Sequence, residues 1–336
     1  MGNEKVSRKL LSTWRILFFV TLKKSISQLF KGRLDALSMI KYYFTIILFT
    51  AHCSLSTAKA QSDTLLRPNY RALHWIFAGE TVAYTGSIFG LNKAWYKNNS
   101  FSRFSFNDDS HEWKQLDKVG HFFSAYQICR HTAALYKNTG ISRKQAALYG
   151  ALSGFMFLTP IEILDGFQHP TYGFSPSDMA ANMLGPSLYL GQYALWGEER
   201  IQPKFSFHPT SLAQVRPELL GSNLSEQWLK DYNGQTYWFS VNVASFAPHS
   251  KLPKWLSVSL GYGIQNMVGA EIEKSRSLGY DPYRQYYLSL DIDFRRIHTR
   301  HKGLKTLFFL LNTLKVPAPT LAFNRKQGFV GHWLYF

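Results

Sequence analysis

Apolar residues recur with helical spacing along four stretches in the first part of the chain. These stretches cover residues 72–92, 117–137, 142–164 and 176–196. In each of them apolar positions repeat every three or four residues, as in an amphipathic helix that packs one face on a core. Polar, Gly and Pro residues, which end and begin helices, separate the stretches. The pattern predicts a four-helix bundle over residues 61–200.

From Thr236 onward, apolar positions repeat every two residues. Four runs rich in aromatic and β-branched residues alternate apolar and polar positions, as half-buried antiparallel strands do. They lie at residues 236–246, 255–264, 285–296 and 328–336. A run at Leu304–Val316 interrupts them and predicts one short, very apolar helix. The expected fold class is α+β, with residues 201–235 as a linker and residues 236–336 as an antiparallel β-rich region.

Residues 1–60 have the composition of a leader for export. Residues 39–60 contain an early basic residue, an apolar run over Tyr42–Ala51 and small residues at Ala58 and Ala60. This order is typical of a secretory signal peptide, and it predicts cleavage after Ala60. A permanent anchor is the less favoured alternative, because the apolar run of about ten residues is shorter than the roughly 20 that cross a bilayer.

The leader leaves two alternatives open. Translation starts at Met1 or at Met39, and the segment between them is basic with an apolar patch of its own. Cys53 is a candidate for lipid attachment, but residues 50–52 before it depart from the pattern of small residues and Leu that precedes a lipidated Cys. Removal of the leader would leave Cys129 as the single thiol, which excludes an internal disulfide.

Composition and charge fit a folded, exported protein. The 336 residues are 46% hydrophobic and 16% aromatic, which excludes a disordered chain or a collagen-like fibre. The net charge of +17 falls to +9 without residues 1–60, which hold ten of the 38 basic and two of the 21 acidic residues. We expect no nucleic-acid partner, because export separates the protein from nucleic acid. A membrane surface is an equally good partner for a late basic cluster. Its members are Arg295, Arg296, Arg300, Lys302 and Lys305.

Three of the predicted helices carry polar residues at helical spacing, and we name these residues the motif set. The set consists of Asp117, Lys118, His121, Tyr126, Arg130, Glu162, Asp165, Gly166, Ser175, Asp178, Asn182 and Gly185. Asp117 and His121 are four residues apart, so both project from one helix face. Glu162 and Asp165 stand among apolar residues, where an unpaired charge is costly to bury, so both need partners.

Three interpretations of the motif set are compatible with the sequence. The first is an acid/base or divalent-metal site built between helices, with His121, Glu162 and Asp165 as catalytic candidates. Its candidate metal ligands are Asp117, His121, Glu162 and Asp178. The second is a structural network of ion pairs with Asp178 capping its own helix, and the third is a set of unrelated exposed charges. We favour the structural network, because one His among carboxylates is a weaker signal than H-E-x-x-H. No cofactor is expected, and a divalent metal is the alternative.

The order of the motifs resembles a known family. D-K-x-x-H-F-x-x-x-Y begins at Asp117, E-x-x-D-G-F begins at Glu162 and G-F-S-x-x-D-x-x-x-N-x-x-G begins at Gly173. Over residues 70–200 this order resembles the YfiM-like family of predicted bacterial envelope lipoproteins, and the HWLYF ending is similar to that of longer members. A more distant similarity is to the VanZ-like integral-membrane family. The resemblance implies a location in the cell envelope and does not imply a mechanism.

The sequence therefore predicts an exported envelope protein of a Gram-negative-type bacterium, in the periplasm or associated with the outer membrane. A non-enzymatic structural or interaction role is favoured, with a membrane surface or an envelope component as partner. The alternative is a bundle-type enzyme that acts on a lipid or cell-wall intermediate, with His121 as acid/base. The chain lacks P-loop, G-x-S-x-G and C-x-x-C motifs, which argues against the commonest nucleotide-binding, hydrolase and zinc-ribbon classes.

Overall fold

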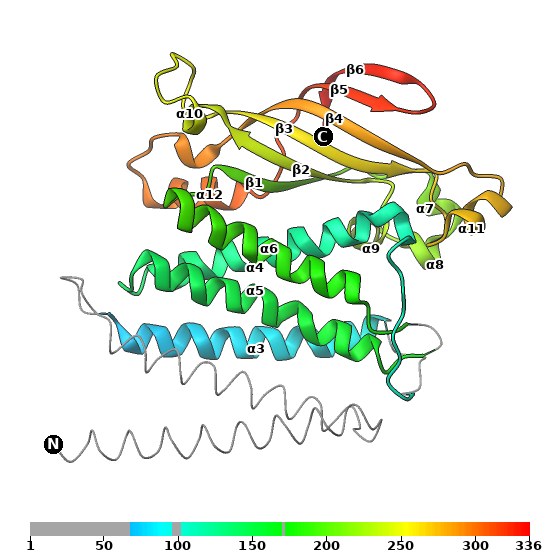
Figure 1. Ribbon diagram of the computed structural model, residues 1–336, viewed down its shortest axis with the longest axis horizontal. Helices are drawn as coiled ribbons and strands as arrows, with labels where there is room; N and C mark the ends of the chain where they lie inside the picture. The colour runs from blue at the N-terminus through cyan, green and yellow to red at the C-terminus, as the bar shows by residue number, and fades with distance from the viewer. Residues whose placement is uncertain (1–67, 96–101, 170–171) are drawn as a thin grey trace. The chain divides into compact units, whose positions relative to one another are not determined.

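The computed structural model describes residues 68–95, 102–169 and 172–336 of the chain (Figure 1). The predicted cleavage site after Ala60 and the lipidation candidate Cys53 lie outside these ranges, as do both candidate start residues. Cys129 lies within them as a free, buried thiol.

The described chain forms two compact units. The first unit comprises the described residues up to Asp108 together with Ile128–Met179. The second comprises Asp109–Gln127 and Ala180–Phe336. Of the three boundaries between the units, the one at Asp108 lies in a loop and the other two fall inside α-helices, so neither unit is one continuous stretch of chain.

All four helices that the apolar spacing predicts are present. They are α3 (Tyr70–Trp95), α4 (Leu116–Lys137), α5 (Arg143–Asp165) and α6 (Pro176–Trp196). Ser142 begins α5 with a capping box, because its hydroxyl accepts a hydrogen bond from the Gln145 backbone at 3.2 Å and the Gln145 side chain accepts one from the Ser142 backbone. The unit boundaries divide α4 and α6, so the packing of all four helices in one bundle stays a prediction.

The first unit is helical, and its core connects the start of α3 with the α4–α5 region. Its buried cluster consists of Leu73, Tyr136, Ile141, Ala146 and Tyr149. The rings of Tyr136 and Tyr149 meet edge to face with their centroids 5.4 Å apart. Among the described residues, α5 is the one helix that is long and apolar enough to cross a membrane, and 56% of its most apolar window is buried within the structure.

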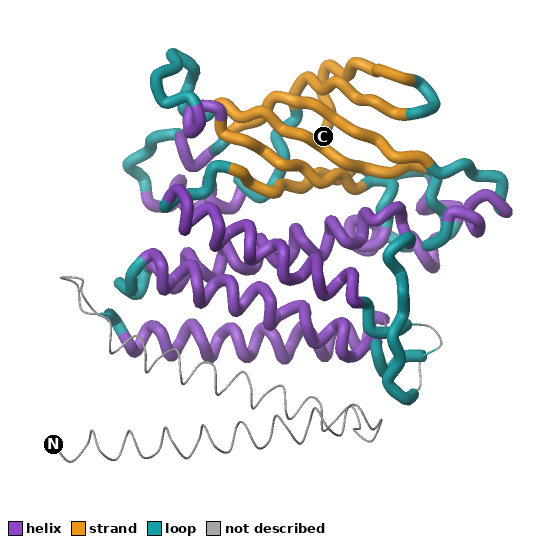
Figure 2. The backbone as a smooth tube through the Cα atoms, in the orientation of Figure 1, coloured by secondary structure: helices purple, strands orange, loops and turns teal. Residues whose placement is uncertain are grey.

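Six antiparallel strands form one sheet in the second unit, in the order of the chain (Figure 2). The strands are β1 (Ile201–Phe207), β2 (Gln235–Asn242), β3 (Leu256–Gln265), β4 (Tyr283–Ile292), β5 (Ala318–Asn324) and β6 (Gly328–Tyr335). Short helices lie before and between them. These are η1 (Glu112–Gln115), α7 (Leu212–Val215), α8 (Pro217–Leu220), α9 (Leu224–Lys230), α10 (Val243–Phe246), α11 (Ile272–Ser277), η2 (Phe294–Arg296) and α12 (Lys302–Leu311).

The structure adds two strands, β1 and β5, to the four that alternation predicts. β1 opens the segment 201–235 that the sequence assigns to a linker, and α7, α8 and α9 also lie there. The predicted helix at residues 304–316 corresponds to α12, which ends at Leu311. The chain then pairs with β1, because Phe205 N–H donates to the carbonyl of Thr313 at 3.0 Å and Lys315 N–H donates to that of Phe205 at 2.9 Å.

The inner face of this sheet is buried, and it carries many polar residues beside an apolar cluster of Trp238, Tyr287 and Ala322. A row of directly opposed polar residues crosses five strands, and it consists of Gln202, Ser240, Ser259, Ser289 and Thr320. The sheet curls around this face, because Tyr335 Oη of β6 lies 3.2 Å from Thr236 Oγ1 of β2 although three strands separate the two.

The outer face of the same strands is apolar. Leu260, Leu288 and Leu321 are opposite one another on β3, β4 and β5, and their side chains are 58%, 46% and 44% exposed. We call the exposed set on these strands and β6 the outer apolar face. It consists of Leu260, Tyr286, Leu288, Leu290, Leu321, Phe323 and Phe329. The predicted alternation is therefore confirmed, and the apolar side of the sheet stays exposed at these positions of β3–β6.

Helix α4 covers the outer face of β1 and β2. Phe123 of α4 lies with its ring centroid 5.8 Å from that of Phe205 and 5.4 Å from that of Tyr237. Trp113 and Leu116 extend this core at the start of α4. The second unit therefore has an apolar core on the outer side of β1, β2 and the end of β3, where Ile264 is buried, whereas the outer apolar face defined above is exposed.

Candidate functional site

Three consecutive residues with left-handed backbone precede α4. Trp113, Lys114 and Gln115 have φ angles of 45°, 50° and 68°. Each such residue costs about 1–2 kcal/mol relative to the right-handed conformation. Neighbouring groups hold the turn, since Trp113 N–H donates to the carbonyl of Ala270 at 2.8 Å and Tyr262 Oη donates to that of Lys114 at 2.5 Å. Strain of this kind is concentrated at functional sites.

Lys118 lies between two carboxylates beside this turn. Its Nζ is 2.8 Å from Oδ2 of Asp109 and 2.8 Å from Oδ2 of Asp117. Oxygens of the two Asp residues lie within 4.8 Å of each other, a spacing that two ligands of one metal ion can have. Because the ammonium group already supplies a cation there, this arrangement favours the structural interpretation of Asp117 and Lys118.

Glu112 adds a titratable carboxyl group to this acidic region. Burial and the neighbouring carboxylates of Asp109 and Asp117 raise the pKa of Glu112 to about 7, and Lys118 offsets part of this effect. A carboxyl group that titrates near neutral pH is a candidate proton donor or acceptor. The sequence did not indicate Asp109 or Glu112 as site residues, because both precede Asp117, where the first motif begins.

His121 is oriented by a hydrogen bond to another motif residue. Its Nδ1 lies 3.1 Å from Oδ1 of the fully buried Asn182. Because the amide oxygen accepts, the ring donates from Nδ1. Gly185 lets α6 approach α4 here, since a Cβ at this position would lie 2.4 Å from the carbonyl oxygen of Phe122.

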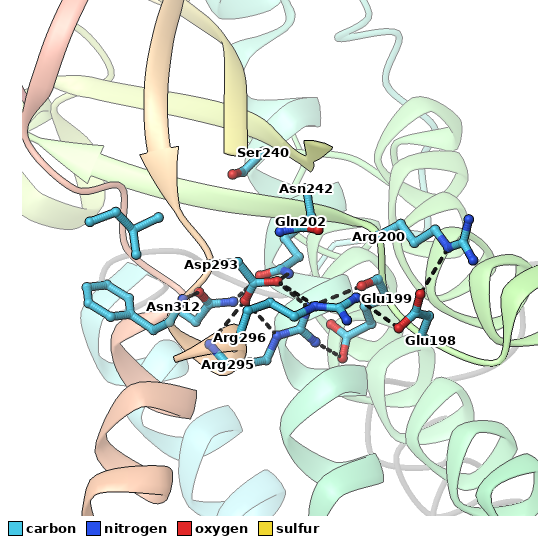
Figure 3. A network of polar contacts seen from close by, with 12 residues as sticks. Glu198, Glu199, Arg200, Gln202, Ser240, Asn242, Asp293, Arg295, Arg296 and Asn312 are labelled. Atoms are coloured by element: carbon cyan, nitrogen blue, oxygen red, sulfur yellow. Dashed lines mark hydrogen bonds and ion pairs between the residues drawn. The ribbon is translucent and has the colours of Figure 1, made fainter. Parts of the chain in front are cut away.

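Tyr126 connects the motif set to a buried ion network in the second unit. Figure 3 shows Glu199, Asp293 and Arg295 of this network. Its hydroxyl donates to Glu199 Oε2 at 3.0 Å, while Arg295 lies 2.6 Å from Glu199 Oε1 and 3.2 Å from Asp293 Oδ1. Burial alone would lower the pKa of Arg295, but Glu199 and Asp293 outweigh it and raise the pKa. Burial alone would raise the pKa of Asp293, but Arg295 holds it below the ordinary value of 3.8.

A second buried ion pair lies on the inner face of the sheet. Lys204 Nζ is 2.8 Å from Asp291 Oδ2, and both side chains are fully buried. The hydroxyl groups of Ser240 and Ser259 donate to the same carboxylate oxygen at 2.7 and 3.2 Å. Burial lowers the pKa of the nearby Lys315 to about 8. Hydrogen bonds within the protein thus compensate the charges of this face, as a structural network requires.

The motif residues of the first unit are mostly buried. Arg130, Glu162, Ser175 and Asp178 are at most 6% exposed, whereas Asp165 is half-buried. Oxygens of Glu162 and Asp178 lie within 4.8 Å of each other. Ser175 caps α6, because its Oγ accepts a hydrogen bond from the Asp178 backbone at 3.0 Å. That the His and carboxylate candidates of both units share one site stays a prediction.

Other motif residues of the first unit have a packing role. The rings of Phe167 and Phe174 lie 5.1 and 5.7 Å from that of Phe104. A Cβ at Gly166 would lie 2.3 Å from the ring of Phe104, so only glycine fits there. Packing therefore explains the G-F ending of the second motif and the Phe of the third.

A cavity of about 450 Å³ lies in the first unit among α3, α4 and α5. Glu80 is the single carboxylate among its lining residues in the described chain. Tyr136 Oη donates to Glu80 at 2.8 Å and Ser153 Oγ donates at 3.1 Å. Burial raises the pKa of Glu80 above the ordinary value of 4.5, and the two hydrogen bonds offset only part of this effect. The sequence shows an acid in an apolar helix but does not show this cavity.

The comparisons with known proteins support an envelope location. Residues 104–193 match the model of a family described as Predicted periplasmic lipoprotein (DUF2279). The match includes the whole motif set, from Asp117 to Gly185. No curated protein and no solved structure matches the chain significantly. The family description confirms the prediction of an exported, periplasmic or membrane-associated location, whereas the YfiM-like and VanZ-like resemblances are not confirmed.

The ion network includes two residues of the late basic cluster. Arg295 and Arg296 do not form one free basic surface with the residues after them. Arg295 pairs with Glu199 and Asp293, and Arg296 pairs with Glu198 at 2.8 Å. One sequence pattern could have indicated this network, because a polar residue stands at every second position of one segment. These residues are Ser289, Asp291 and Asp293.

Proposed function

We propose that the protein is a non-enzymatic structural or interaction protein of the cell envelope that attaches to the outer membrane through the outer apolar face of its sheet. The family match supports the envelope location. The observation that carries the membrane attachment is the exposure of the outer apolar face on β3–β6. Polar residues are buried on its inner face, and leucine and aromatic residues are exposed on its outer face.

The energetic argument is the cost of leaving this face in water. Full burial of one leucine or phenylalanine side chain contributes about 1.5–3 kcal/mol. Leu290 is 50% and Phe329 72% exposed, so a large part of that free energy is still available to a partner. Water-soluble monomers rarely keep large contiguous apolar patches exposed. Apolar-out and polar-in alternation is the pattern of sheets that contact lipid.

Aromatic residues at the end of the chain support the same partner. Phe323 and Phe329 stand opposite each other on β5 and β6 with ring centroids 5.0 Å apart. Trp333 on β6 is 90% exposed. Trp is enriched where proteins meet the membrane interface, because its ring is apolar and its N–H can still reach polar groups.

The contacts of the motif set support a structural role for its members in the second unit. Lys118 pairs with Asp109 and Asp117, and Tyr126 donates to Glu199. These polar groups form hydrogen bonds and ion pairs within the protein. Under this proposal they fix the first half of α4, which covers β1 and β2.

A matched pair of triple variants tests the proposal. The first replaces Leu260, Leu288 and Leu321 on the outer apolar face by Gln. The control replaces three exposed leucines elsewhere in the second unit, Leu224, Leu252 and Leu278, by Gln. Wild type and the control should stay with the membrane fraction after a carbonate wash, whereas the first variant should be released. Release of all three proteins, or retention of a correctly folded first variant, would contradict the proposal.

The alternative of a bundle-type enzyme is favoured by one observation. The strained turn Trp113–Gln115 lies next to Glu112, whose pKa is raised to about 7. An enzyme that acts on a lipid or cell-wall intermediate should accumulate its substrate when Glu112 is replaced by Gln. Mass spectrometry of envelope extracts from the Glu112→Gln strain and from a deletion strain would show the same accumulated compound under this alternative. Under the structural proposal it would show none.

A further inference from the structure

The late basic residues divide into a paired and an unpaired set. Arg295 and Arg296 form ion pairs with acidic residues of the second unit. Arg300, Lys302 and Lys305 are exposed, and they have no ion pair within the described residues. The uncompensated positive charge of this segment therefore lies at and just before the start of α12.

Helix α12 is amphipathic, and a row of leucines along it is exposed. Leu304, Leu307 and Leu310 follow one another at intervals of three residues and are 40%, 46% and 50% exposed. Phe308, four residues after Leu304, lies beside this row and holds the helix in place, because its ring stacks on that of Phe294 with centroids 5.7 Å apart. The helix thus has a fixed position and an unpartnered leucine row.

The residue after α12 strengthens this attachment. Phe294 N–H donates to Asn312 Oδ1 at 2.9 Å, and Asn312 also hydrogen bonds to Gln202 of β1. The contacts of Phe308 and Asn312 hold α12 in place, so the leucine row is not needed for this attachment. It is available to a partner.

We propose that α12 is an anionic-lipid site. Its leucine row enters the apolar edge of a membrane while Arg300, Lys302 and Lys305 contact lipid phosphate groups. The proposal rests on the membrane attachment proposed above and names the lipid class that the protein selects. Long basic side chains can place their charge at the headgroups while their carbon chains stay in contact with apolar lipid. A helix with leucines on one side and basic residues beside them is the kind that lies in a membrane interface.

Charge selectivity separates this site from the outer apolar face. Apolar contacts alone bind neutral and anionic vesicles equally well. Each Lys or Arg near an anionic surface strengthens binding by about fivefold, and salt weakens the effect. Three such residues therefore predict a preference of up to about a hundredfold for anionic vesicles at low salt.

The test is co-sedimentation of the full chain with vesicles of phosphatidylcholine alone and with vesicles that contain phosphatidylglycerol. The test variant carries Arg300→Gln, Lys302→Gln and Lys305→Gln. The control variant carries the same charge change at three other exposed lysines, Lys251, Lys254 and Lys274. All six positions are exposed, so both variants should melt like wild type.

Wild type and the control should prefer the anionic vesicles by up to about a hundredfold, and the test variant should lose most of this preference while its binding to neutral vesicles is unchanged. Retention of the preference by the test variant would overturn the α12 site and leave the membrane attachment intact. Binding of wild type to neither vesicle would overturn the proposed function itself. Inorganic phosphate should not release the bound protein beyond the effect of chloride at equal ionic strength. Specific release would assign the three bases to free phosphate rather than to lipid.

Discussion

The two units bury carboxyl groups in different ways. In the first unit Glu80 lines a mostly apolar cavity and accepts hydrogen bonds from the hydroxyl groups of Tyr136 and Ser153. In the second unit Asp293 is paired with the guanidinium group of Arg295. Burial dominates at Glu80 and raises its pKa, whereas the cation outweighs burial at Asp293 and lowers its pKa.

At these two carboxyl groups the charge of the partner decides the direction of the pKa shift. Two hydroxyl donors at Glu80 do not compensate the loss of water, because neither carries a charge. The polar inner face of the sheet brings cations and carboxylates together, as in the pair of Lys204 and Asp291. Loss of a partner should therefore have its largest effect in the second unit.

The largest effect is expected for Arg295→Met. The substitution leaves Glu199 and Asp293 without their shared cation, and these side chains are only 4% and 1% exposed. Breaking such a pair costs about 3–5 kcal/mol, because an uncompensated charge stays buried. Urea denaturation should show this loss of unfolding free energy for the second unit. The exposed Arg300→Met is the control and should change stability by less than about 0.5 kcal/mol. Equal effects of the two variants would show that the network does not stabilise the unit.

A smaller, pH-dependent effect is expected for Asp293→Asn. The pKa of Asp293 in the folded protein lies below 3.8, so its contribution to stability is present above that pH and is lost as the pH falls through the folded pKa. At neutral pH the variant should be less stable by about 1.5–3 kcal/mol, since a hydrogen bond to a charged group is lost. Acid titration of unfolding should show the difference from wild type shrinking at low pH. A constant difference would mean that Asp293 is not charged in the folded state.

Glu80→Gln should have the opposite pH dependence. The pKa of Glu80 in the folded protein lies above 4.5, so the favourable protonated state is fully present below 4.5 and is lost as the pH rises through the folded pKa. The Gln variant is always neutral and should become progressively more stable than wild type over that range. Thermal melts from acid to neutral pH would measure the gap. Glu273→Gln on the exposed surface of α11 serves as control, and an equal gap there would remove the special role of the cavity.

Local patterns predicted the elements better than the interactions between them. The four long helices and β2, β3, β4 and β6 follow from apolar spacing, because spacing is a property of neighbouring residues. β1 was missed because Pro203 interrupts its pattern and its inward positions are polar, including the buried Lys204. The phase of the sheet was also not predictable. Leu288 and Ser289 alternate in the same way whichever of them faces inward.

The candidate site shows the same limit. The spacing of four residues placed Asp117 and His121 on one helix, and the order of motifs included Asn182, which lies 61 residues after His121 and forms a hydrogen bond to it. Arg295 and Glu199 are 96 residues apart, and no motif connects them. Their contact depends on how β1 and η2 are brought together by the sheet, which local spacing does not encode.

The smallest effect on stability is expected for His121→Gln. This variant extends the comparison of partners to His121, whose partner Asn182 is a neutral amide. An amide at this position can still donate to Asn182 Oδ1, so the variant should lose at most about 0.5–1.5 kcal/mol of stability. Gln cannot take up or release a proton, so acid/base chemistry at this position would stop. Glu162→Gln is the corresponding variant in the first unit, where it keeps the shape of the side chain and weakens metal ligation.

These two variants separate the structural and the enzymatic hypotheses because both should fold under either one. Under the structural hypothesis, strains with His121→Gln or Glu162→Gln should grow nearly as well as wild type under envelope stress, where a deletion strain fails. Purified wild type should then contain no stoichiometric metal. Under the enzymatic hypothesis the folded variants should fail to complement the deletion, and metal analysis of wild type should find about one ion per chain if a divalent metal takes part. We expect the structural outcome, since Lys118 already pairs with Asp109 and Asp117 and the Asn182 amide already orients His121. Folded, inactive Gln variants beside a metal-loaded wild type would reverse that conclusion.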